Sequence, residues 1–138
     1  MDSKAGQIVH QMMEKDFFSQ WLGIRILETK EGYCKLSMVI REEMCNGFSI
    51  AHGGIAYSLA DSAVAFAANA HGRHAVSIET SISHIRPLSA GEIIIATAEE
   101  KSISNKIAIY EVQVSKDDGP LVALFKGTVY RKNTEWAE

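Results

Sequence analysis

The sequence predicts an α+β domain in which a curved antiparallel β-sheet wraps around one long helix. The segment 55–70 is apolar on nearly all sides, which is typical of a buried helix rather than an amphipathic one. Six further segments have the patterns of strands, two before this helix and four after it. Only a sheet that curves around such a helix would cover all of its sides.

A short helix and a hairpin are predicted ahead of the buried helix. Apolar residues recur near helical spacing across 7–22, which indicates an amphipathic helix folded onto the body of the protein. We expect its aromatic side chains to pack in the core rather than to line a ligand pocket: Phe17, Phe18 and Trp21. The segments 24–29 and 33–40 alternate partly between apolar and polar residues and are separated by a Glu-Gly turn, which predicts a hairpin.

Four strands are predicted after the buried helix, and Gly72 suits the left-handed position that closes a helix. Turn-forming residues separate the strands, including Pro87 in the first connection. We expect consecutive strands to be antiparallel neighbours. The four segments are 75–86, 92–101, 106–116 and 121–131.

Composition limits the classes of protein. With 46% hydrophobic residues in 138, there is enough apolar material for one core, so we expect a single domain over 1–138. Fourteen Lys and Arg against seventeen Asp and Glu give a net charge of −3, which disfavours a nucleic-acid partner. The buried helix is shorter than the ~20 residues that cross a bilayer and carries Asp61 near its middle, so no membrane span is expected.

The cysteines and the N-terminus favour a cytoplasmic protein. Cys34 and Cys45 do not form a CxxC pair and are too few for a disulfide scaffold, as in proteins of a reducing compartment. Residues 1–20 contain no apolar stretch of the kind found in signal peptides.

The segment 46–54 concentrates the candidate chemistry. Gly53 and Gly54 begin the buried helix, so a ligand could approach bare backbone N–H groups at the positive end of the helix dipole. This arrangement would allow an oxyanion hole. Asn46 adds a neutral donor, and His52 could cap or orient the turn. A Gly-Gly pair at a helix start also occurs as a purely structural cap.

Asp61 strengthens the functional interpretation. Carboxylates are almost never fully buried without a partner, and this apolar helix leaves Asp61 few routes to water. It is either a hydrogen-bonded structural residue or a general base or nucleophile in a partly dry site. Eight residues separate it from Gly53, so it lies about 12 Å farther along the helix axis. Two chains with antiparallel central helices would bring the two groups together, which predicts a dimeric site.

These residues resemble a known family. The run from Asn46 through His52-Gly53-Gly54 to Asp61 is similar to that of the hotdog-fold acyl-CoA thioesterases, and most of all to the PaaI type of phenylacetic acid degradation. The resemblance covers nearly the whole chain. Further matching stretches are Leu22-Gly23-Ile24, Ile85-Arg86-Pro87, Thr97-Ala98 and Val122-Ala123-Leu124-Phe125.

The resemblance implies a hotdog fold and hydrolysis of a thioester. Its carbonyl oxygen would be held by the Gly53 N–H, with Asn46 and His52 fixing the loop on the substrate side. Asp61 of the partner subunit would activate water or attack the carbonyl, and both routes remain open. Ser77 occupies the place of an assisting hydroxyl, although a strand serine can also be a plain surface or ladder residue.

The resemblance also implies the partners. The substrate would be phenylacetyl-CoA, a ring-hydroxylated form, or another aryl or short- to medium-chain acyl-CoA. The protein would be a homodimer or homotetramer with its active sites at the dimer interface. No cofactor would be needed, since coenzyme A is part of the substrate. Cations that could meet the coenzyme A phosphates, or simply solvate strand ends, are Arg86, Lys101, Lys106 and Arg131.

Competing interpretations are a hotdog hydratase or dehydratase, a non-catalytic acyl-CoA-binding protein and a purely structural dimer. The spacing from His52-Gly53-Gly54 to Asp61 disfavours the hydratase. A metal site would combine His71 and His74 with Asp61 or His84, but no third ligand recurs at useful spacing. We otherwise expect His84 to be a surface or strand residue. Cys45 lacks a positioned histidine partner, which disfavours a cysteine nucleophile.

Overall fold

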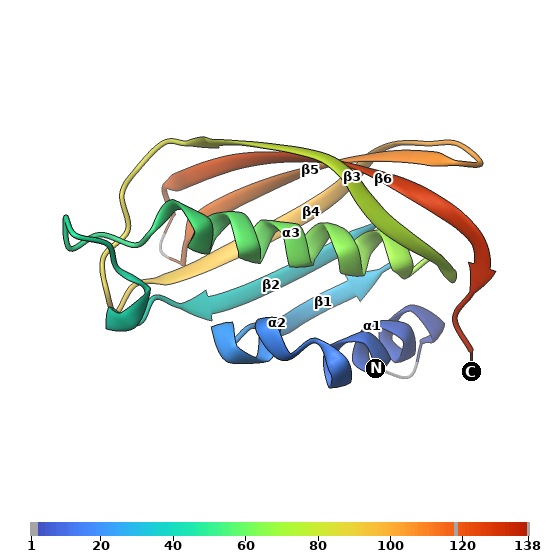
Figure 1. The fold of residues 1–138 in the computed structure, drawn as a ribbon, viewed down its shortest axis with the longest axis horizontal. Helices are drawn as coiled ribbons and strands as arrows, with labels where there is room; N and C mark the ends of the chain where they lie inside the picture. The colour runs from blue at the N-terminus through green and yellow to red at the C-terminus, as the bar shows by residue number, and fades with distance from the viewer. Residues whose placement is uncertain (1–2, 118, 138) are drawn as a thin grey trace.

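The computed structural model describes residues 3–117 and 119–137. Six strands form one sheet around a long helix, and two short helices precede them (Figure 1). In chain order the elements are α1 (Lys4–Lys15), α2 (Phe17–Leu22), β1 (Arg25–Lys30), β2 (Tyr33–Val39), the 3₁₀ turn η1 (Glu42–Met44), α3 (Gly53–Asn69), β3 (Arg73–His84), β4 (Ile93–Ile103), β5 (Ile107–Lys116) and β6 (Leu121–Glu135).

The sheet is antiparallel throughout, with strand order β1-β2-β4-β5-β6-β3. It curves around α3 along the helix's length, which confirms the predicted fold class (Figure 1). The expectation that consecutive strands are neighbours is wrong for β3, which pairs with β6 rather than β4. The β3–β4 connection does not turn back as a hairpin, because Leu88 in it accepts a hydrogen bond from the Ala51 N–H (2.7 Å) and so ties it to the loop before α3.

Close contact between α3 and the sheet fixes the helix. Its inward side is rich in alanine, and its buried Val64 faces Gly127 of β6. A Cβ atom at Gly127 would lie 3.2 Å from Val64 Cγ1, so α3 can pack this close to β6 only because position 127 is a glycine. At 17 residues α3 is still too short to span a bilayer, and no other helix in the described ranges meets that requirement.

The C-terminal end of α3 is anchored by Asn69, which is buried. Its Nδ2 donates to the carbonyl oxygens of Ala65 (2.8 Å) and Ala75 (3.0 Å). Its Oδ1 accepts from the Ala75 N–H (3.0 Å) and from Trp136 Nε1 (2.9 Å). Gly72 has the expected positive φ of 111°. One side chain therefore joins the end of α3 to the start of β3 and the end of β6.

The N-terminal segment forms two helices, where the sequence predicted one over 7–22. Asp16 separates them: its carboxylate accepts hydrogen bonds from the Ser19 N–H (3.0 Å) and from Ser19 Oγ (2.7 Å), which caps α2. The new direction buries Ser19 and Leu22. It turns the aromatic residues outward, so the expectation that they pack in the core is wrong. Their exposed fractions are 73% for Phe17, 55% for Phe18 and 53% for Trp21.

Candidate active site

The first turn of α3 leaves one backbone donor open. His52 is the N-cap, and its Nδ1 accepts a hydrogen bond from the Gly54 N–H at 2.9 Å. This bond requires the proton of the neutral ring to sit on Nε2. The His52 carbonyl accepts from the Ile55 N–H at 2.9 Å. Within the described ranges no group accepts the Gly53 N–H, which therefore presents the positive end of the helix dipole to a ligand.

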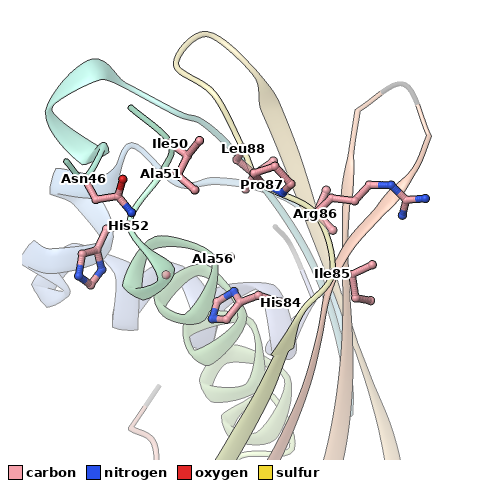
Figure 2. Close-up of a pocket in the computed structure, with 12 residues that line it drawn as sticks. Asn46, Ile50, Ala51, His52, Ala56, His84, Ile85, Arg86, Pro87 and Leu88 are labelled. Atoms are coloured by element: carbon pink, nitrogen blue, oxygen red, sulfur yellow. The ribbon is translucent and has the colours of Figure 1, made fainter. Parts of the chain in front are cut away.

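A cavity of about 300 Å³ opens in front of this N–H (Figure 2). The loop before α3 forms one wall: the Asn46 N–H donates to the Ile50 carbonyl at 2.7 Å, and Asn46 Oδ1 accepts from the Phe48 N–H at 2.9 Å. The amide nitrogen of Asn46 is left pointing toward the start of α3 (Figure 2). The lining residues are Asn46, Ile50, Ala51, His52, Gly53, Ala56, His84, Ile85, Arg86, Pro87, Leu88 and Val122.

Asp61 lies two turns along α3, half-buried and facing β3. Ser77 Oγ donates to Asp61 Oδ1 across 3.5 Å. Burial raises the pKa of the Asp61 carboxyl above its usual value, the hydrogen bond from Ser77 opposes this rise, and the negative charge of Asp16 adds to it. Asp61 is therefore a stronger base than an exposed aspartate.

Asp61 and Ser77 line a second hollow, a groove of about 430 Å³ between α1, α3, β3 and the end of β6. We call it the Asp61 groove. It shares no lining residue with the cavity at Gly53. Within one chain, the predicted site residues thus form two groups: Gly53, Asn46 and His52 in the cavity, and Asp61 and Ser77 in the groove. The remaining lining residues of the groove are Met12, Ala65, Asn69, His74, Ala75, Val76, Lys132 and Trp136.

Strand β3 connects the two groups. Its register with β6 turns five side chains toward α3: Ala75, Ser77, Thr80, Ile82 and His84. The pairing shifts between Ser77 and Glu79, so Ile78 is an extra, bulged residue. Because α3 and β3 run in opposite directions, the start of the helix faces the end of the strand and the middle of the helix faces Ser77.

His84 lines the cavity at Gly53, a place that the sequence did not predict for it. The expectation of a surface or strand residue is confirmed, since His84 ends β3 and is exposed, and its side chain also lines the cavity beside Gly53 (Figure 2). A Cβ atom at Gly53 would lie 3.3 Å from His84 Nε2. Counting alternate residues back from His84 to Thr80 would have predicted an inward side chain, but only the tertiary fold brings the strand end to Gly53.

The histidines of the rejected metal site lie in separate clusters. His71 Nε2 is 2.7 Å from Glu100 Oε1, which also accepts from the Tyr110 hydroxyl at 2.7 Å. The His74 ring packs against Trp136 with centroids 4.5 Å apart. Across 3–117 and 119–137, no group of three His, Cys, Asp or Glu residues could hold a metal ion.

Neither Cys34 nor Cys45 lines the cavity at Gly53 or the Asp61 groove. Both cysteines are free. Burial raises the pKa of Cys34 to about 12, which keeps it protonated and inert. Cys45 is half-buried, and its Sγ is 3.9 Å from the Arg41 carbonyl oxygen.

Among the four cations considered for coenzyme A phosphates, only Arg86 lines the cavity at Gly53. Its guanidinium donates to the Leu121 carbonyl oxygen at 2.7 Å and points away from the cavity (Figure 2). The other three lie near the β4–β5 hairpin, where the Arg131 N–H donates to the Lys106 carbonyl and Lys101 Nζ is 3.8 Å from Glu111.

Comparison with known proteins decides the family. Residues 48–123 match the model of the thioesterase superfamily. The chain belongs to this superfamily. It is a thioester hydrolase of the hotdog fold and of the PaaI type. It is 36% identical to the acyl-coenzyme A thioesterase PaaI of Escherichia coli over 131 residues, covering 95% of this chain and 94% of that protein.

Two further comparisons agree. A putative esterase of Archaeoglobus fulgidus is 42% identical over 138 residues, covering 97% of this chain and 90% of its own. The solved structure of E. coli PaaI, a protein of the phenylacetic acid degradation operon, superposes with a TM-score of 0.93 at 35% identity over 96% of both chains. The E. coli structure therefore shares the fold of this chain over nearly its whole length.

Proposed function

We propose that this thioester hydrolase acts on acyl-CoA, with phenylacetyl-CoA, its ring-hydroxylated forms, or related aryl or medium-chain acyl-CoA as substrates. The observation that carries the proposal is the open Gly53 N–H at the start of a buried 17-residue helix, facing a cavity of about 300 Å³. A preorganised N–H at a helix N-terminus stabilises the negative charge that develops on a thioester oxygen. The name of the E. coli relative supports the choice of acyl-CoA.

The proposed reaction needs Asp61 from a second copy of the chain. Gly53 and Asp61 are about 12 Å apart along one helix axis, which is too far for both to act on one carbonyl. In a two-fold dimer with antiparallel α3 helices, the start of one helix lies beside the middle of the other. A site of this kind takes the Gly53 N–H, Asn46 and His52 from one protomer and Asp61 with Ser77 from its partner.

The outer edge of β3 is the proposed dimer contact. In the described sheet β3 pairs only with β6, so its other edge is free, and exposed apolar side chains lie along the strand at Val76 (45% exposed) and Ile78 (58%). A free, apolar strand edge is a ready site for pairing with another strand. An antiparallel pair of β3 strands would also make the two α3 helices antiparallel.

The site fixes the register of this pair. In an antiparallel pair, two residues directly opposite each other point to the same face of the sheet. A residue that points toward α3 must therefore lie opposite another that does so. In a two-fold pair this holds only when the axis passes at one residue, which then lies opposite its own copy in the partner. With Ser81 on the axis, Ile82 lies opposite the partner's Thr80. The Ile78 bulge then brings His84, next to Gly53, opposite the partner's Ser77, next to Asp61. This register unites the two halves of the site.

In this site the Gly53 N–H binds the carbonyl oxygen, and Asn46 and His52 hold the loop that carries the substrate. Asp61 either takes a proton from water as the water oxygen attacks the carbonyl carbon, or attacks that carbon itself to form a mixed anhydride, which water then hydrolyses to free the product acid and the Asp61 carboxylate. In both routes the C–S bond breaks, the coenzyme A thiolate leaves and takes up a proton, and water supplies the oxygen of the product acid. The proposal therefore includes no cofactor, and the free thiols agree with a cytoplasmic enzyme.

Release of free thiol from a panel of aryl and fatty acyl-CoA thioesters tests the function. We expect thiol release from at least one aryl or medium-chain substrate and little from the Asp61→Asn variant. Hydration of a 2-enoyl-CoA without thiol release would identify a hydratase instead. Binding of acyl-CoA without either reaction would identify a binding protein, and no binding would leave only a structural dimer.

Mixing two inactive variants tests the shared site. In a mixed dimer of Asp61→Ala and Asn46→Ala chains, one of the two sites is intact. Free exchange at equal concentrations makes half of the dimers mixed, so activity should return to about a quarter of the wild-type value. No recovery despite demonstrated exchange would contradict a shared site, and sedimentation of an active monomer would contradict any dimer. The same sedimentation run distinguishes a dimer from a tetramer.

A cross-linking pair tests the register. Under mild oxidation Ser81→Cys should give a covalent dimer, because residues that pair across an antiparallel ladder have Cα atoms about 4.5–5.5 Å apart, within disulfide range. Ser83→Cys is the matched control on the same face. Its two copies would be about 13 Å apart and should stay unlinked. Linking at position 83 but not at 81 would refute the register.

A further inference from the structure

His84 has no role in the reaction described so far, yet its ring borders the oxyanion donor. The side chain projects from the end of β3 into the cavity at Gly53 (Figure 2). His84 Nε2 lies 3.3 Å from the place where a Gly53 Cβ would be. Any residue with a side chain at position 53 would therefore contact this imidazole.

The His84 ring is free to bind a ligand. Within the described ranges no hydrogen bond or ion pair engages either of its nitrogens, whereas His52 is engaged by the Gly54 N–H and His71 by Glu100. Its neighbours in the cavity include apolar side chains of Ala56, Ile85 and Val122. His84 itself is exposed at the mouth of the cavity, so its ring is accessible to a substrate that enters there.

The distance permits one oxygen to accept from both groups. A Cβ atom lies about 2.5 Å from the nitrogen of its own residue, so Gly53 N and His84 Nε2 are at most about 5.8 Å apart. Two donors that each lie about 2.9 Å from a common oxygen can be up to about 5.8 Å apart. The distance between the two nitrogens therefore allows one carbonyl oxygen to lie between them and accept from both.

We infer that His84 is a second oxyanion donor: its Nε2–H donates to the thioester carbonyl oxygen alongside the Gly53 N–H. The inference rests on the proposed function and adds a catalytic residue to it. His84 forms no covalent bond and keeps its proton. It stabilises the charge on the oxygen while the carbonyl is attacked, and the interaction weakens when the thiolate leaves and the carbonyl re-forms. The proposed register also places it opposite the partner's Ser77, at the point where the two halves of the site meet.

Paired substitutions at His84 test the donor. His84→Phe keeps a ring of similar size and removes the N–H, and kcat should fall by about 10²–10³, the usual effect of losing one oxyanion donor. His84→Gln restores an N–H near the same place and should recover at least tenfold of that loss. His10→Phe is the matched control, since His10 is an exposed histidine on α1 whose side chain is 60% exposed. Its kcat should equal that of the wild type.

A spectroscopic readout separates the donor role from a packing role. A ketone analogue of the substrate, with CH₂ in place of sulfur and ¹³C at the carbonyl, reports polarisation of the C=O bond by its chemical shift. Binding to His84→Phe should move that resonance toward its value in free solution, while His84→Gln keeps most of the wild-type shift. A packing role would lower the melting temperature of His84→Phe and leave the carbonyl shift unchanged.

The outcomes distinguish the inference from the function on which it rests. Thiol release by the wild type with an equal kcat for His84→Phe overturns the donor role and leaves the thioesterase in place. An equal ¹³C carbonyl shift for the analogue bound to the wild type and to His84→Phe also overturns the donor role. Absence of thiol release by the wild type on every thioester overturns the proposed function itself.

Discussion

Replacing Asp61 by asparagine should abolish most turnover while leaving the protein folded. The amide has nearly the size of the carboxylate but can neither accept a proton from water nor attack a carbonyl carbon. A general base usually contributes about 10²–10⁴-fold, and a nucleophile can contribute more. At about 1.36 kcal/mol for each factor of ten, kcat loss of this size corresponds to about 2.7–5.4 kcal/mol of the activation barrier.

The same substitution should change the free energy of unfolding little, because a small loss and a small gain oppose each other. The asparagine Oδ1 can still accept the hydrogen bond from Ser77 Oγ, and at 3.5 Å this bond contributes no more than the lower end of the usual 0.5–1.5 kcal/mol, so its weakening costs little. Against this loss, burial raises the pKa of Asp61, so the ionised form is less stable in the fold than in the unfolded chain. That destabilisation is absent below the unfolded pKa and grows as the pH rises through the folded one. A neutral amide removes it at pH 7.

Thermal unfolding and turnover measured on one preparation decide between the roles. We expect a melting temperature within about 4 °C of the wild type, since about 1 kcal/mol moves a chain of this size by no more than that. Asp61→Ala is the companion variant, because it removes the polar group altogether. A melting temperature lowered by much more, with turnover per folded molecule intact, would make Asp61 a structural residue and would refute the mechanism.

Three other predictions follow from contacts in the structure. Ser77→Ala removes the hydrogen bond that lowers the pKa of Asp61, so the acidic limb of the kcat/KM profile should move to higher pH; a shift to lower pH would show that the limb does not report Asp61. Gly127→Ala should lower the free energy of unfolding by about 1–3 kcal/mol in denaturant titration, because its Cβ would lie 3.2 Å from Val64 Cγ1. Adding Val64→Ala should cost less in that background than in the wild type, and equal costs would contradict the contact. Cys34 should resist thiol reagents at pH 8 until the protein unfolds, since burial raises its pKa to about 12; labelling as fast as a free thiol would contradict its burial.

The sequence predicted the helix and strands well where a repeating pattern reports burial. The apolar segment 55–70 is α3, observed at Gly53–Asn69, because a helix surrounded by a sheet needs apolar residues on every side. The break at Asp16 was missed, since the apolar spacing continues on both sides of it. What identifies Asp16 as the cap of α2 is the pair of hydrogen bonds that its carboxylate accepts from Ser19, and these are visible only in the structure. Pairing of β3 with β6 was also missed, because alternation within a strand says which face is buried and not which strand lies beside it.

The site was predictable only as far as it depends on one segment. The Gly-Gly helix start, its His52 cap and the aspartate two turns later are local features, and a residue count places them along one axis. His84 is 31 positions after Gly53, and its neighbourhood depends on the antiparallel course of α3 and β3. The Ile78 bulge hides the alternation further, because Ser77 and Thr80 face the same side although three positions separate them.

The separation of the two groups on α3 explains why this fold should place its chemistry between two chains. A helix has an open N–H such as that of Gly53 only at its start, where the dipole favours negative charge, and a carboxylate beyond the first turn of the same helix lies too far along the axis to reach it. A carboxylate in the first turn would itself occupy the donor. Asp61 lies two turns farther along, away from the donor and in a groove whose partial burial raises the pKa of its carboxyl. At that position it is about 12 Å along the axis from Gly53, too far to act on the same carbonyl within one chain. In the proposed dimer, a second copy turned about an axis at Ser81 would return the base to the carbonyl.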